Sequence, residues 1–205
     1  IGETTDNLSV VALGKMATGD ALRHLNQPQE AWNKLDDAGK LFQQVSDEIG
    51  WARTRIGMLA LCVDLNEVEV AVADAEIALT ILREYSEIEK LARLQVNLGF
   101  VFNYLSQYRK AIEKCQEALE LTQFLGEDGR NRLPVIYFNM GNAHLGLGNL
   151  QVAWDYYQKS RELMAANGET IGVALADLNL INIAQAQGHN KLALHLLHDT
   201  VDTLA

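Results

Sequence analysis

Several residue types are scarce in this 205-residue sequence. It contains two prolines and two cysteines, and aromatic residues make up only 7% of the chain. Alanine, leucine, glutamine and glutamate are abundant instead, and these strong helix formers outnumber the β-branched and aromatic residues that strands favour. The composition therefore predicts an all-α protein.

The sequence also lacks the signals of a secreted or membrane protein. Cys62 and Cys115 lie inside apolar helical patterns, which predicts two reduced core residues of an intracellular protein. No apolar run approaches the roughly 20 residues that span a bilayer, and the N-terminus has no signal-peptide pattern. We expect a cytoplasmic protein without a membrane partner. Because the chain begins at Ile1 rather than Met, we also expect a fragment of a longer protein, whose other domains could contact it.

Basic residues are too few for a nucleic-acid partner. The chain has 17 Lys and Arg against 27 Asp and Glu, a net charge of -10. Binding to phosphates needs clustered Lys and Arg, and the sequence has no such cluster. Most of the excess acid lies in residues 1–90, which hold sixteen acidic against eight basic side chains.

One pattern of small and apolar residues recurs five times. Its anchors are Ala31, Ala71, Ala111, Ala153 and Ala193, separated by 40, 40, 42 and 40 residues. Each unit has two apolar-periodic stretches joined by a short turn, which predicts an antiparallel helix pair. One pair alone would expose apolar surface, so the pairs must stack into a right-handed α-solenoid with a concave inner face. We expect a single domain over residues 1–205, with repeats at about 8–46, 51–86, 89–126, 131–168 and 171–205.

The boundaries of the ten expected helices follow from the apolar periodicity and from helix breakers. Breaker-rich joints at 126–131 and 167–170 separate neighbouring units. The first helices of the repeats are expected at about 8–25, 51–65, 89–105, 133–146 and 171–187, and the second helices at about 29–45, 68–84, 108–124, 150–166 and 190–203.

Two segments carry a family resemblance. "NLGFVFNYLSQYRKAIEKCQEAL" and "NMGNAHLGLGNLQVAWDYYQKS" have a Leu-Gly or similar pair, an aromatic residue and small residues at the spacing of a helical repeat. They resemble tetratricopeptide repeats, although the family's early tryptophan and closing proline are absent. The 40-residue spacing is similar to that of long-repeat members in kinesin light chains, spindle-orientation adaptors and bacterial signalling proteins. The resemblance implies a non-enzymatic interaction domain that binds an extended peptide or protein segment on its concave face, without a cofactor.

The glycines of the second segment could also suggest a phosphate-binding loop. Such a loop needs Lys followed by Ser or Thr after its second glycine, whereas Gly146 is followed by Leu147 and Gly148. A dinucleotide fingerprint would need a preceding strand, and none is expected. We expect Gly141 to allow two helices to approach closely, and Gly146 and Gly148 to end a helix and turn the chain.

A stripe along the first helices supplies the candidate binding residues. Asparagine is a poor helix-interior residue, yet it recurs in register, and its amide can bind the backbone of an extended peptide. Arginines on the stripe would bind carboxylates, and aromatic side chains would add contact area. The alternative is that the asparagines bond a neighbouring helix or face water, and that the arginines pair with nearby acids. The candidates are Arg53, Arg93, Asn97, Phe100, Tyr104, Phe138, Asn139, Asn142, Asn179 and Asn182.

Metal binding and catalysis have weaker support. His195, His198, Asp199 and Asp202 share one helical face and could bind zinc. This face points away from the expected core, so we expect a solvated surface and no metal site. No serine or cysteine has a base and an orienting acid near it, so we expect no enzyme.

A second hypothesis for the function is a regulatory, ligand-sensing domain of a larger bacterial signalling ATPase or a caspase-like (CHAT-type) protein.

Overall fold

The computed structural model describes residues 2–204, and side chains from residue 7 to residue 201. Within that range the chain is all-α and has no strand, which confirms the predicted fold class. Its helices are α1 (Gly2–His24), α2 (Pro28–Gln44), α3 (Glu48–Leu61), α4 (Val68–Glu84), α5 (Ile88–Tyr104), α6 (Tyr108–Thr122), α7 (Gly126–Arg130), α8 (Leu133–Gly146), α9 (Leu150–Ala166), α10 (Thr170–Ala186) and α11 (Asn190–Leu204).

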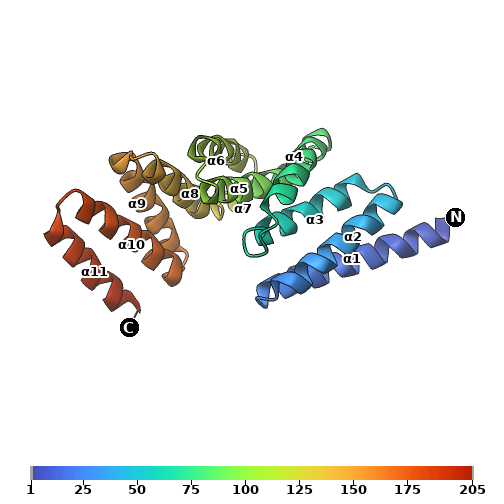
Figure 1. Ribbon diagram of the computed structural model, residues 1–205, viewed down its shortest axis with the longest axis horizontal. Helices are drawn as coiled ribbons and strands as arrows, with labels where there is room; N and C mark the ends of the chain where they lie inside the picture. The colour runs from blue at the N-terminus through green and yellow to red at the C-terminus, as the bar shows by residue number, and fades with distance from the viewer. Residues whose placement is uncertain (1, 205) are drawn as a thin grey trace. The chain divides into compact units, whose positions relative to one another are not determined.

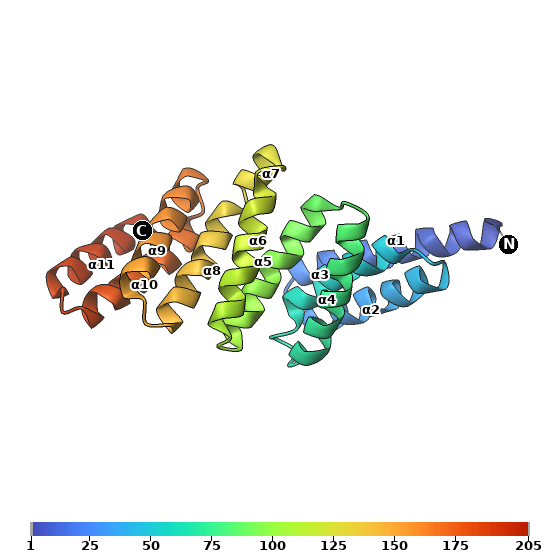
Figure 2. The same ribbon diagram turned by 90° about the horizontal axis from the view of Figure 1, so that it is seen from above.

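Within each compact unit the helices follow one another as stacked antiparallel pairs (Figure 1). The contacts divide the chain into two compact units, one ending at Val101 and the other beginning at Phe102, so that α5 contributes to both. In the first unit α2 packs on α1 and on α3, and α4 packs on α3. In the second unit α8 packs on α6 and on α9, α9 packs on α10, and α10 packs on α11 (Figure 2). No helix among the described residues is both long and apolar enough to cross a membrane.

Several helix boundaries differ from the sequence-based expectation. Helix α1 begins at Gly2 rather than at about residue 8, and α3 begins at Glu48 rather than at about residue 51. The helix expected to reach residue 65 ends at Leu61, and the residues after it form a turn. The joint expected at 126–131 contains the short helix α7, with Glu127 and Asp128 in its first turn. Acidic residues stabilise a helix N-terminus, and this favours the extra turn despite the two glycines of the segment.

A left-handed residue follows the end of most helices and reverses the chain. In the turn after α4, the Ser86 N–H donates to Arg83 O at 3.1 Å and the Glu87 N–H donates to Leu82 O at 2.9 Å. These paired bonds satisfy carbonyls that the helix end would leave unpaired. The residues with positive φ are Asn26, Ser46, Asn66, Ser86, Ser106, Gly126, Gly148, Gly168 and Gly188, so the turn recurs about twice in each repeat.

Glycine at position 86 should stabilise the protein. Ser86 has φ of 55°, a conformation that strains a residue with a Cβ. We expect Ser86→Gly to raise the free energy of unfolding by about 0.5–1 kcal/mol, the relieved strain less the entropy that glycine loses on folding. Urea unfolding measures the change. Gly168→Ser is the matched reverse variant and should destabilise the protein by a similar amount; equal stability of both variants and the natural chain would contradict the assignment.

Small residues hold the helices of a pair close together. The five anchor alanines are all buried. A Cβ added to Gly141 would lie 2.8 Å from the Tyr157 ring, so this glycine permits the close approach that the sequence predicted. Gly148 has φ of 77° and turns the chain, also as predicted. Gly146 has a further role, since a Cβ there would lie 2.3 Å from the Tyr108 ring.

Candidate functional site

A pocket of about 250 Å³ lies among the first helices of three successive repeats, α1, α3 and α5. We call it the first-helix pocket. All of its lining residues belong to the first unit. The structure brings the two predicted arginines together here, although they are 40 positions apart in the sequence. The lining residues are Met16, Asp20, Arg53, Ile56, Gly57, Glu89, Lys90 and Arg93.

The first-helix pocket has more positive than negative groups, in a chain whose net charge is -10. The Arg93 guanidinium lies 3.9 Å from Glu89, one helical turn earlier, and its side chain stays exposed. Lys90 pairs with Glu87 at 2.5 Å. Arg53 is half-buried and forms no ion pair with any residue that the structure describes. The Arg53 guanidinium is therefore available to an anionic group of a ligand.

The floor of the pocket is apolar, because the side chains of Met16 and Ile56 are both buried. Phe100 lies two helical turns after Arg93 on α5, on the same side of that helix, and its ring is exposed. Tyr104, the last residue of α5, is also exposed. Phe100 and Tyr104, two of the three predicted aromatic contact residues, thus present surface to solvent, as a contact residue must.

Two of the predicted asparagines bond within the protein. Asn97 Nδ2 donates to the carbonyl of Ile56 on α3 at 3.2 Å. Asn142 Oδ1 accepts from the Tyr157 hydroxyl at 2.7 Å. Burial raises the pKa of Tyr157, which keeps the phenol protonated as a donor. These two amides match the alternative interpretation, in which the asparagines bond a neighbouring helix.

The other three asparagines differ in exposure. Asn139 is 2% exposed, so its side chain does not reach solvent. Asn179 is half-buried and donates to Leu175 O, one turn earlier in its own helix, at 3.0 Å. Asn182 is exposed. A partner can therefore reach the Asn182 amide but not that of Asn139.

Some residues of the structure were not among the sequence candidates. Lys90 and Asp20 line the first-helix pocket, and Asp20 occupies in the first repeat the register of the predicted stripe. Repeat register is the signal that points to it. Phe138, a predicted contact residue, is half-buried and packs edge-on against Tyr157, with ring centroids 5.5 Å apart. Its ring contributes to the core of the second unit.

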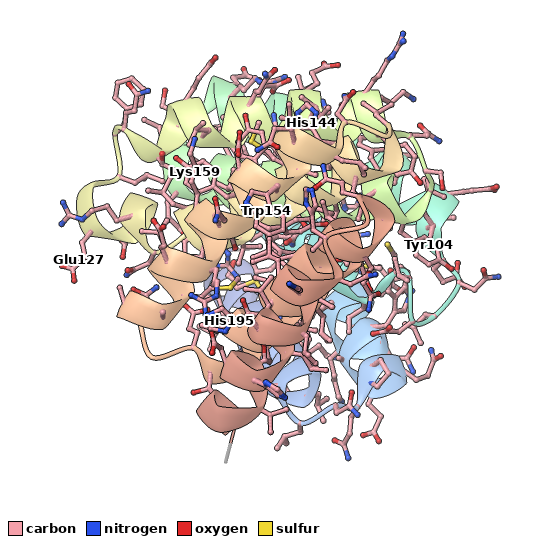
Figure 3. All side chains as sticks on the ribbon, turned by 90° about the vertical axis from the view of Figure 1, so that its left-hand side faces the viewer. Tyr104, Glu127, His144, Trp154, Lys159 and His195 are labelled. Carbon is pink, nitrogen blue, oxygen red and sulfur yellow. The ribbon has the colours of Figure 1, made fainter. Side chains whose placement is uncertain are left out.

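The histidines and cysteines have structural surroundings. His195, labelled in Figure 3, forms an exposed pair with Asp199 at 3.3 Å. The described residues contain no cluster of three metal-binding side chains. The side chain of Asp202 lies outside the described residues.

His144 stacks on Tyr156 with ring centroids 5.5 Å apart, and desolvation lowers the pKa of His144. Burial raises the pKa of Cys62 to about 11 and that of Cys115 to about 12, so neither thiol ionises readily at neutral pH.

Residues 90–166, which include the two segments singled out in the sequence, match the family model of the tetratricopeptide repeat. This part of the chain consists of tetratricopeptide repeats. Response regulator aspartate phosphatase E of Bacillus subtilis (strain 168) is 24% identical to it over 146 residues, which are 70% of this chain and 39% of the phosphatase.

Solved structures share the fold of this chain at low sequence identity. A Rap protein crystallised in complex with competence and sporulation factor has a TM-score of 0.78 and 17% identity, over 92% of this chain and 52% of the Rap protein. A putative kinesin light chain from Podosopora anserina has a TM-score of 0.73 and 16% identity, over 97% and 96% of the two chains. The chain therefore spans 39% of the phosphatase and about half of the Rap protein. It spans nearly all of the kinesin light chain structure.

Proposed function

We propose that this protein is a non-enzymatic interaction domain that binds an extended peptide or protein segment, and that the first-helix pocket receives an acidic group of that segment. The observation that carries the proposal is the convergence of Arg53, Lys90 and Arg93 from two helices on one pocket in an otherwise acidic protein. The fold is shared with a Rap protein that was crystallised with a bound factor, which supports a binding role.

The chemistry of the pocket favours a carboxylate. A guanidinium can bind both oxygens of a carboxylate, and such charge-assisted bonds are stronger than neutral ones. Arg53 has no ion pair with a described residue to lose when a ligand binds. The exposed ring of Phe100 would contact the ligand beyond the acidic group. Asn182, an exposed residue of the second unit, remains a separate candidate for contact with a partner.

A second candidate function is that of a ligand-sensing domain within a larger bacterial signalling protein, such as a signalling ATPase or a caspase-like protease. The likeness to a response regulator phosphatase, of which this chain spans 39%, favours it. The same pocket would then bind a ligand whose presence changes the activity of a neighbouring domain. Both candidate functions place the protein in the cytoplasm, where its two free cysteines would stay reduced.

The arginines of the pocket provide the test. Peptides of twelve residues would be selected from a random display library against the full chain, and their affinities measured by fluorescence anisotropy. We expect enrichment of Asp and Glu, and at least a tenfold loss of affinity, about 1.4 kcal/mol, in the double variant Arg53→Ala/Arg93→Ala. Since neither arginine holds a buried ion pair, the melting temperature should change little.

A matched control separates recognition from general charge. Arg130→Ala/Lys191→Ala removes the same charge from exposed positions outside the pocket. Peptide affinity should be unchanged in this variant. Selected peptides without acidic enrichment, or an equal loss of affinity in the control, would show that the pocket is not the binding site.

A further inference from the structure

The outer face of α4 is apolar where α2, α6 and α9 are mainly charged. Counted from the anchor alanine, its exposed positions are one residue before and two, six and nine residues after; in α4 these are Val70, Ala73, Ile77 and Thr80. We call these four residues the α4 outer face. Val70 is 55% exposed and Ile77 is 54% exposed. The same positions hold Glu30, Asn33, Asp37 and Lys40 in α2, Lys110, Glu113, Glu117 and Glu120 in α6, and Val152, Asp155, Lys159 and Glu162 in α9.

The repeat fold does not require this apolar surface. Helices α2, α6 and α9 pack with their neighbours while they present mainly charged side chains at these positions. Six residues after the anchor, α4 alone of the five second helices has an apolar residue, Ile77, where Asp37, Glu117, Lys159 and Asp199 stand in the others. A contiguous exposed apolar face that folding does not need is typical of an interaction site.

A slot of about 400 Å³ opens beside the α4 outer face. Trp51 forms its buried floor, and Ile77 and Ile81 form one wall. The Arg55 guanidinium covers one side of the Trp51 ring, 4.9 Å from its centroid, and fixes the indole in place. The slot is therefore preformed and large enough for an apolar side chain.

The rim of the slot is acidic. Asp47 and Glu48 line it, together with Gln43 and Ser46, and no Lys or Arg is among its lining residues. Glu69, Glu76 and Glu84 are exposed on α4, whose one basic residue is Arg83. The apolar surface is thus bordered by negative charge, which favours a partner with Lys or Arg beside its apolar residues.

We infer that the α4 outer face and its slot dock a basic amphipathic helix of a partner protein. The face extends from Val70 to Thr80, and these ten steps of 1.5 Å along the helix make it about 15 Å long. This length suits apolar residues on two to three turns of a partner helix. A large apolar side chain of the partner helix fills the slot over Trp51. Lys or Arg residues of the partner helix form ion pairs with Asp47 and Glu48. A second copy of this chain fits poorly, because each copy carries a net charge of -10.

This site is separate from the first-helix pocket. Trp51 and Arg53 are two residues apart on α3, so that their side chains point to nearly opposite sides of that helix. No residue lines both cavities. The inference therefore holds whether or not the first-helix pocket binds a carboxylate.

Two designed peptides of 18 residues test the inference. Both carry leucines along one helical face; one has lysines beside the leucines and the other has glutamates. Fluorescence anisotropy with the full chain should show binding of the lysine peptide, at least tenfold weaker binding of the glutamate peptide, and at least a tenfold loss for Ile77→Asp. Aspartate is a natural residue at this register, at Asp37 and Asp199, so the variant should fold. Nonspecific attraction would increase with the added negative charge, so a loss of affinity reports on the apolar face.

Controls distinguish the possible outcomes. Val152→Asp makes the same kind of change at an exposed position of α9 and should leave binding unchanged, as should Arg53→Ala/Arg93→Ala. Failure of the lysine peptide to bind, equal binding by Ile77→Asp, or an equal loss in Val152→Asp would overturn the inference. Self-association of the natural chain in sedimentation, abolished by Ile77→Asp, would instead assign the face to a second copy.

Discussion

Replacing Tyr157 with alanine should lower the free energy of unfolding by about 3–5 kcal/mol. Tyr157 is fully buried, and it forms the core of the second unit with Ala153, Leu180 and Ile183. Its ring also lies against Gly141, which has no side chain to fill a void. The truncation therefore loses a large buried area and leaves a cavity that cannot easily collapse. Urea unfolding followed by circular dichroism measures the loss.

The phenylalanine variant separates packing from hydrogen bonding. Tyr157→Phe keeps the ring and removes the hydroxyl that donates to Asn142. We expect a loss of about 1 kcal/mol, the net value of one hydrogen bond. Tyr137→Ala is a control at a half-buried ring in the same helix pair and should cost less than Tyr157→Ala. A loss below 1.5 kcal/mol for Tyr157→Ala would mean that the second unit repacks around the cavity.

The sequence predicted the helix pairs well because their signal is repeated. The same small residue marks the second helix of each unit, and period and register support one another over five copies. Gly141 was predicted to pack and Gly148 to turn, and both predictions are confirmed by local geometry. Helix α7 was not predicted, because its five residues are too few for a periodic pattern and contain two glycines.

The candidate site was harder to predict than the fold. Repeat register correctly identified residues that share a position, but a shared position does not fix exposure. Asn139 and Asn179 stand at the same register, yet Asn139 is buried whereas Asn179 is half-buried and bonds its own helix. Burial depends on the neighbouring side chains, which differ from repeat to repeat. The register did align Arg53 with Arg93, and both line the first-helix pocket.

The α4 outer face could not be identified as an exposed apolar surface from the repeat register alone. Ile77 stands in the sequence where four other repeats have charged residues. The contrast becomes informative only once the structure shows that the position faces solvent. In a buried position the same isoleucine would be an ordinary core residue.

Removal of the Asp177 carboxylate should be the second large loss of stability. Asp177 is fully buried on α10, where it accepts a hydrogen bond from Arg161 Nε on α9 and one from Thr200 Oγ1 on α11 at 3.2 Å. One carboxylate thus joins α9 to the two helices of the last repeat, α10 and α11. Asp177→Ala leaves the Arg161 guanidinium without its partner in a partly buried site. Breaking a buried pair costs about 3–5 kcal/mol, and because Arg161 is 32% exposed we expect the lower end of that range, about 3 kcal/mol.

Two variants test whether the charge or the bridging geometry is responsible for this loss. Asp177→Asn keeps the size and an acceptor oxygen but removes the charge, so its loss should lie between zero and that of Asp177→Ala. Asp199→Ala removes the carboxylate of the exposed pair with His195 on the same terminal helix and should change stability by less than about 0.5 kcal/mol. Chemical denaturation of all three variants gives the comparison. If Asp177→Ala and Asp199→Ala cost the same, the buried carboxylate does not hold α9, α10 and α11 together, and apolar packing alone accounts for the stability of the last repeat.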